Sequence, residues 1–133
     1  MVDIEVEIFD KCAKAVLAKF PDAFTSSVNV SAPASYPAMS MVEADNMTDS
    51  SRTDSSGETA SIVTYDIRVF SNLRQGARTQ AKQIAQEVDE VMTSFNFRRT
   101  YRGQGASVND PSVYQVTCRY MAGVTKDGKL YRR

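Results

Sequence analysis

Histidine is missing from this chain of 133 residues, and histidine is the commonest general base and the commonest transition-metal ligand in proteins. Its absence excludes catalytic triads that depend on histidine, and it excludes most zinc sites. Cysteine is scarce as well, since Cys12 and Cys118 lie far apart and each recurs in step with apolar neighbours. We expect both to be small core residues rather than a disulfide or reactive thiols.

Long apolar runs and phosphate-binding loops are absent too. No apolar run is long enough to cross a membrane, and the acidic start MVDIEVEIFDKC lacks the apolar segment of a secretory signal. We therefore expect a soluble protein that is made and used in the cytoplasm, with no membrane partner. Gly103 and Gly105 stand in a GQG stretch without the lysine and the following helix of a phosphate loop, so we expect no cofactor.

The composition that remains is typical of one globular domain. Hydrophobic residues make up 42% of the chain and charged residues 24%, which is too apolar for a disordered segment. A chain of this length can bury about two-thirds of its unfolded surface. No repeat and no second domain are visible, so residues 1–133 are interpreted as a single domain.

The stretch from Ala60 to Phe95 predicts a strand, a short turn and a long helix. The strand alternates, with Val63, Tyr65 and Ile67 among the residues of its apolar face. The helix repeats apolar residues at steps of three and four from Ala77 onward, in a stripe wide enough to cover a sheet. Asn72 with Gln75 resembles a capping box at its start, although Gly76 favours a regular helix only from Ala77.

The other elements follow from the same kinds of pattern. A helix and five further strands are expected at residues 3–20, 27–32, 35–42, 97–101, 113–124 and 130–133. On the strand at 97–101, Arg99 and Tyr101 are expected to share one face, with Arg98 and Arg102 on the other. The fold class is therefore α+β: a mostly antiparallel sheet with two helices packed on one face and a long polar β-hairpin loop.

That hairpin loop covers residues 43–59, where EADNMTDSSRTDSSGE has almost no apolar content. Loops of this length in compact domains are usually functional or disordered. Its acids lack the alternating Asp/Asn positions and the central glycine of a calcium loop, so no metal site is expected. We expect either a plain solvated loop or a mobile tip that orders against a partner.

Charge is divided between the two halves of this neutral chain. Residues 1–66 hold 4 Lys/Arg and 11 Asp/Glu, a balance of −7, whereas residues 67–133 hold 12 and 5, a balance of +7. Three interpretations stay open: solvated faces, complementary surfaces that meet between subunits, and a nucleic-acid footprint, which a pI near 6.3 disfavours for duplex binding. The cluster Arg98–Arg102 likewise suits a polar strand face, an interface or single-stranded nucleic acid.

A small metal-dependent nuclease is the first of two enzymatic alternatives. Asp66-Ile67-Arg68 imitates an acid-x-lysine arrangement on a strand. Arginine keeps its proton at working pH and is a poor substitute for a catalytic lysine. We interpret Asp66 and Arg68 as the outer, solvated face of the strand, and we expect no enzymatic activity; a small toxin-like enzyme is the other alternative of this class.

The order, lengths and residue character of the elements resemble a known family. The N-terminal helix, the strand pair around a polar loop, YDIRVFSN, the turn into QGARTQAKQIAQEVDEVMTSFNF, the arginine-rich FRRTYR and the closing VYQVTCRYMAGV are similar to tail-terminator and tail-completion (head-tail joining) proteins of long-tailed bacteriophages and prophages. The resemblance covers roughly residues 4–133 and includes no catalytic motif.

The resemblance implies a structural virion protein assembled in the bacterial host cytoplasm. Such subunits form a ring, typically a hexamer, that caps the head-proximal end of the tail tube, ends tube polymerisation and offers the docking surface for the head connector. The implied partners are copies of itself, the tail tube protein and the connector or stopper protein, with DNA only passing through the lumen. A different neck protein, such as a head-completion or stopper subunit, is the alternative in this setting.

We expect the contacts to lie in two segments, the polar loop and the arginine-rich stretch. The expected subunit or partner interface consists of Asp45, Asp49, Arg52, Asp54, Glu58, Arg98, Arg99 and Arg102.

Overall fold

The computed structural model describes residues 3–28, 33–49, 60–107 and 110–132. Its elements are α1 (Glu5–Lys19), β1 (Phe24–Ser26), β2 (Ala38–Thr48), β3 (Ala60–Ser71), α2 (Ala77–Ser94), β4 (Arg98–Ala106), β5 (Tyr114–Thr125) and β6 (Leu130–Tyr131). The predicted order of helices and strands and the predicted α+β class are confirmed, and the chain forms a single domain.

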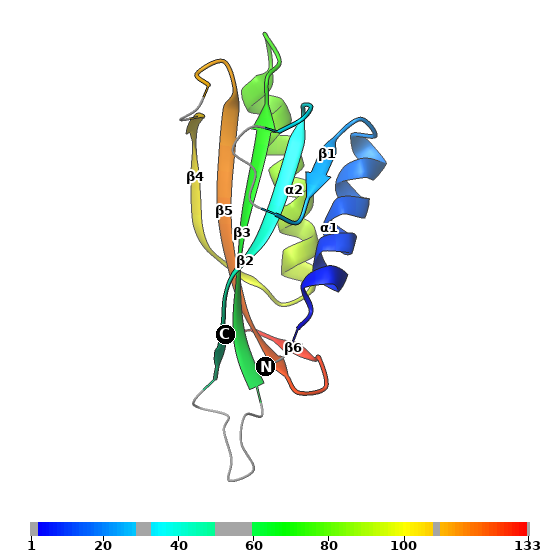
Figure 1. The fold of residues 1–133 in the computed structure, drawn as a ribbon, viewed down its shortest axis with the longest axis vertical. Coiled ribbons are helices and arrows are strands. Elements are labelled where there is room, and N and C mark those ends of the chain that lie inside the picture. The colour runs from blue at the N-terminus through cyan, green and yellow to red at the C-terminus, as the bar shows by residue number, and fades with distance from the viewer. Residues whose placement is uncertain (1–2, 29–32, 50–59, 108–109, 133) are drawn as a thin grey trace.

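The six strands form one sheet, in the order β1-β2-β3-β5-β4, with β6 pairing β5 beyond the end of β4. All pairs are antiparallel except β1 with β2. Both helices lie on the same side of the sheet. The end of β2, the beginning of β3 and the end of β5 extend beyond the helices, at the bottom of the view (Figure 1). No helix in the described part of the chain is both long and apolar enough to cross a membrane.

The core lies between the helices and one face of the sheet. Strand β3 contributes Val63, Tyr65, Ile67 and Val69, which are all buried, and the Tyr65 ring meets Phe97 edge to face with centroids 5.6 Å apart. The predicted stripe of α2 is confirmed, because its buried residues are Ala81, Ile84, Ala85, Val88 and Met92. Alternation at steps of two on the strands and of three and four on the helices therefore places one apolar layer inside.

Three strand predictions and the cap of α2 are wrong in detail. Of the strand expected at 27–32, Ser27 and Val28 are not in a strand, and residues 29–32 lie outside the described residues; a short strand is found just before, at Phe24–Ser26. The polar loop expected from residue 43 begins later, since Glu43–Thr48 continues β2 against β3. Strand β4 continues through Gly103–Gly105 to Ala106, beyond the predicted end at residue 101.

The cap of α2 differs because Gly76 itself occupies the N-cap position. Its φ of 85° lies in the left-handed region, and no side chain caps the helix. Glycine adopts this conformation without the steric cost that a side chain imposes. The helix accordingly begins at Ala77, as the sequence indicates, but the Asn72–Gln75 capping box does not form.

Both cysteines are buried free thiols, as predicted. The Cys12 Sγ lies 3.6 Å from the Met92 sulfur, between α1 and α2. Burial raises the pKa of Cys12 to about 12. Burial also raises the pKa of Cys118, an effect that the charge of Arg102 opposes. Both groups therefore stay protonated and unreactive in the folded protein at neutral pH.

At pH 8 we expect a thiol reagent to leave both cysteines of the folded protein unmodified and to react with both after unfolding in urea. Thr93→Cys, an exposed position on α2, serves as the matched control and should react at once. Because the thiol of Cys12 ionises near 9.0 when unfolded and only near 12 when folded, the free energy of unfolding should fall as pH rises across that interval. Rapid modification of Cys12 in the folded chain would contradict the assignment.

Candidate interaction surface

Strand β4 forms one outer edge of the sheet. It pairs with β5 on one side, and no other strand of the described chain adjoins it. Seven of its nine residues are exposed. A long edge strand presents unpaired backbone N–H and C=O groups to any chain that approaches. The arginine-rich segment therefore lies on a surface that is suited to strand pairing.

An extra residue, Thr100, bulges from β4 and decides which way its arginines face. Arg99 lies opposite Tyr120 and Tyr101 opposite Arg119, so Thr100 has no partner residue on β5. As a result Arg99 and Arg102 share the helix-covered side of the sheet, and Arg98 and Tyr101 share the open side. The predicted pairing of faces, Arg99 with Tyr101 and Arg98 with Arg102, is wrong because one inserted residue inverts the alternation beyond it.

Arg99 differs from the other two arginines because it is tied to α2. Its Nη1 lies 3.2 Å from Asp89 Oδ1, and the Tyr120 hydroxyl donates to the same oxygen at 2.7 Å. Burial, followed by this hydrogen bond, raises the pKa of Tyr120. Arg99 thus helps to hold the edge strand to the helix layer, whereas Arg98 and Arg102 lie exposed on the two sides of that edge.

The predicted acidic residues are placed differently from one another. Asp45 is exposed on β2, opposite Thr64 and next to a second bulge at Ala44. Asp49 is fully buried, so its expected place in a solvated loop is wrong. Its backbone N–H donates to the Ala60 carbonyl at 3.0 Å and extends the β2–β3 ladder. The remaining predicted residues Arg52, Asp54 and Glu58 lie outside the described residues, and their role stays a prediction.

Tyr131 supplies a hydrogen bond to the buried carboxylate of Asp49. Its hydroxyl donates to Asp49 Oδ2 at 2.7 Å, across 82 residues of sequence. Its ring lies against Gly123, where an added Cβ would come within 2.1 Å of the ring carbons. Tyr101 covers Gly103 of β4 in the same way. Aromatic rings that cover glycines on a sheet shield bare backbone, and glycine inside a strand was the only sequence signal for these contacts.

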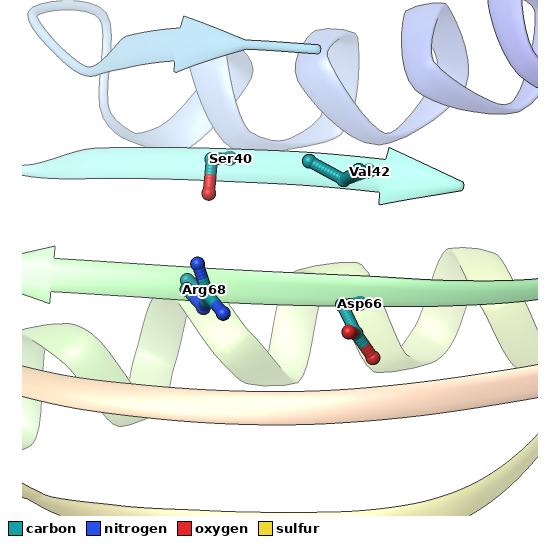
Figure 2. A pocket seen from close by; sticks show the side chains of 4 residues that line it. All are labelled: Ser40, Val42, Asp66 and Arg68. Atoms are coloured by element: carbon teal, nitrogen blue, oxygen red, sulfur yellow. The ribbon is translucent and has the colours of Figure 1, made fainter. Parts of the chain in front are cut away.

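The open face of the sheet holds a small hollow between β2 and β3, lined by Ser40, Val42, Asp66 and Arg68 (Figure 2). Its volume of about 70 Å³ is far below the roughly 300 Å³ or more of small-molecule sites. In Figure 2 the carboxylate of Asp66 points away from Ser40 toward β5. There Arg119 Nε donates to Asp66 Oδ1 at 2.7 Å.

That ion pair involves Asp66, the acidic residue on which the nuclease alternative depends. Asp66 is engaged by Arg119 across the strand pair, as expected for a solvated outer face. Among the residues that the structure describes, no group of three acidic or cysteine side chains is placed to hold a metal ion. The open face thus offers a cross-strand ion pair, which is typically worth at most about 1 kcal/mol.

Acidic side chains gather where α1 begins beside β2. Asp3 accepts a hydrogen bond from the Glu5 backbone N–H at 3.1 Å, and Glu43 accepts one from the Tyr65 hydroxyl at 3.1 Å. Burial is the main cause that raises the pKa of Glu43, and the nearby charges of Glu5 and Asp3 add to it. These residues with Asp45 make up what we call the acidic side of the molecule.

The described part of the polar segment, on β2, does not lie beside the arginines of β4. β3 and β5 lie between β2 and β4, which at about 4.8 Å per strand is a separation of roughly 14 Å. The acidic side and the arginines of β4 are therefore separate surfaces of the same molecule.

Compared with known proteins, the chain matches no family model and no curated protein.

We expect Tyr131→Phe to destabilise the fold by about 1–3 kcal/mol, because a buried carboxylate loses a hydrogen-bond donor. Tyr114→Phe is the matched control. Tyr114 is a half-buried tyrosine of β5 whose hydroxyl has no hydrogen bond within the described residues, and its loss should change stability by about 0.5 kcal/mol or less. Urea unfolding measures both, and equal small effects would contradict a structural role for the Tyr131 hydroxyl.

Proposed function

We propose that this chain is a structural subunit of a bacteriophage virion. It forms a ring at the head-proximal end of the tail tube, ends tube polymerisation and joins the tail to the head. The resemblance of its elements to tail-terminator and tail-completion proteins supports the phage-tail setting. In this proposal the protein has no enzymatic activity, and its partners are further copies of itself, the tail tube protein and the head connector or stopper.

The observation that carries the proposal is the division of charge across the molecule. Acidic residues occupy the first turns of α1, and arginines occupy β4; in Figure 1 these elements lie at opposite sides of the fold. The acids of α1 are Asp3, Glu5, Glu7 and Asp10, with Asp3 just before the helix, and the arginines of β4 are Arg98, Arg99 and Arg102. A subunit with unlike charges on opposite sides is suited to head-to-tail association with its own copies.

Head-to-tail association is consistent with the role of a terminator. A heterologous interface yields a closed ring when its rotation divides a full turn, and it yields a filament when it does not. A ring on the end of a tube occupies the surface on which the next layer of tube protein would add. Polymerisation then stops, and the outer surface of the ring is free to bind the connector.

The first test measures the mass of the purified protein by light scattering and native mass spectrometry, and examines phage particles by electron microscopy. We expect a ring of several subunits, and we expect phages that lack this gene product to make tails of uncontrolled length that do not join heads. A monomer together with normal, joined tails in its absence would overturn the proposal. So would magnesium-dependent DNA cleavage that Asp66→Asn abolishes, because that result assigns the nuclease alternative.

The second test concerns the polar segment between β2 and β3. We expect replacement of residues 50–59 by Asn-Gly, a sequence suited to a two-residue hairpin turn, to leave the thermal unfolding midpoint unchanged within a few degrees. The reason is that β2, β3 and the Asp49–Tyr131 contact stay intact. We expect this variant to lose control of tail length in a complementation assay. Normal tails from a folded variant would show that the segment takes no part in capping.

A further inference from the structure

We propose that neighbouring subunits join edge to edge, with β4 of one copy pairing with the free part of β2 in the next. The inference rests on the proposed function only in that the chain assembles with itself. It adds the two strands that meet and the charges that select them.

The second free edge belongs to β2. Strand β1 pairs with three of the eleven residues of β2, Ala38–Ser40, which leaves the eight residues Met41–Thr48 with β3 as their only strand neighbour in the described chain. Strand β4 offers nine residues. The two open edges therefore match in length, and they lie on opposite edges of the same sheet.

The charges on these edges have opposite sign. The free part of β2 carries Glu43 and Asp45, and β4 carries Arg98, Arg99 and Arg102. Pairing of β4 with another β4 would place arginines together, and pairing of β2 with another β2 would place acids together; like charges on paired strands are destabilising. Pairing of β4 with β2 is the combination in which opposite charges meet, and it produces a head-to-tail interface.

An exposed apolar side chain on each edge supports the same pairing. Met47 of β2 is 52% exposed and Tyr101 of β4 is 54% exposed. Met47 lies opposite Ile62 and Tyr101 opposite Arg119, so both project from the open face of the sheet. A sheet that continues from one copy to the next keeps them on one face, where a methionine–aromatic contact would bury both.

Bulges and charges also protect edge strands from unwanted pairing, and each of these edges carries one bulge, at Ala44 and at Thr100. Charges of one sign on both edges would protect the edges from unwanted pairing equally well. The opposite signs found here block self-pairing of each edge and leave the mutual pairing favourable, which is how an interface specifies its partner.

The test is a charge swap between two variants. R98E/R102E makes β4 acidic, and D45R/T48R makes the free part of β2 basic. Each pair alters one residue on each face of its strand. Both variants keep the Arg99–Asp89 ion pair and the Tyr65–Glu43 hydrogen bond. In low salt we expect each variant alone to associate on the order of tenfold more weakly than the natural chain, or worse. An equimolar mixture should regain assembly, because every contact between unlike variants then joins opposite charges.

Matched controls place the same charge changes elsewhere. R74E/R78E near the start of α2 and E90R/T93R on its later turns alter exposed residues and should assemble like the natural chain. Ring formation by both edge variants alone, equal to that of the natural chain, would overturn the edge pairing and leave the proposed function standing. A natural chain that stays monomeric at every concentration would instead count against both proposals.

Hydrogen–deuterium exchange on the natural chain tests the pairing without any substitution, and it decides the matter if a double variant does not fold. We expect the outward amides of β4 and of Met41–Thr48 to become protected on assembly, by a factor of ten or more, while exposed residues of α2 exchange unchanged. Protection elsewhere, with both edges exchanging as in the monomer, would overturn the inference.

Discussion

Strand β3 is paired along its length on both sides, with β2 and with β5, and the rest of the fold depends on that double pairing. Its inward side chains are buried against the helices, and a slip of one residue would turn them to the open face. The register of β3 is therefore fixed by burial, and with it the positions of β2 and β5. The helices add the second layer but do not set the order of the strands.

Helices and strands whose apolar residues recur at a regular spacing could be predicted from the sequence. Strand β3 begins at Ala60 and α2 spans Ala77–Ser94, close to the expected limits, because alternation and the helical stripe are properties of neighbouring residues. Glu43–Thr48 shows no such period, and it becomes strand because β3 offers it a ladder. Gly103–Gly105 becomes strand for a similar reason, since β5 pairs with it and Tyr101 covers Gly103. Both causes lie far away in the chain.

The candidate site was predictable in its residue types but not in its geometry. The arginines of β4 and the acids of β2 stand out by charge alone, yet the bulge at Thr100 decides which arginines share a face. The contact of Tyr131 with Asp49 joins residues that are 82 positions apart and removes an acid from the surface. A single inserted residue or a distant hydroxyl leaves no periodic signal, so only the assembled sheet reveals them.

The paired strands β3 and β5 also fix how the free edges of β2 and β4 are placed relative to each other, which matters for the proposed assembly. β2 and β4 are attached to the paired strands β3 and β5, so the spacing and angle between the two free edges are fixed by backbone hydrogen bonds rather than by side chains. In the proposed assembly every copy then repeats the same rotation relative to the last. A constant rotation is what closure of a ring requires. In that assembly the core would supply the constant rotation, and the charges on Glu43, Asp45, Arg98 and Arg102 would select which edges meet.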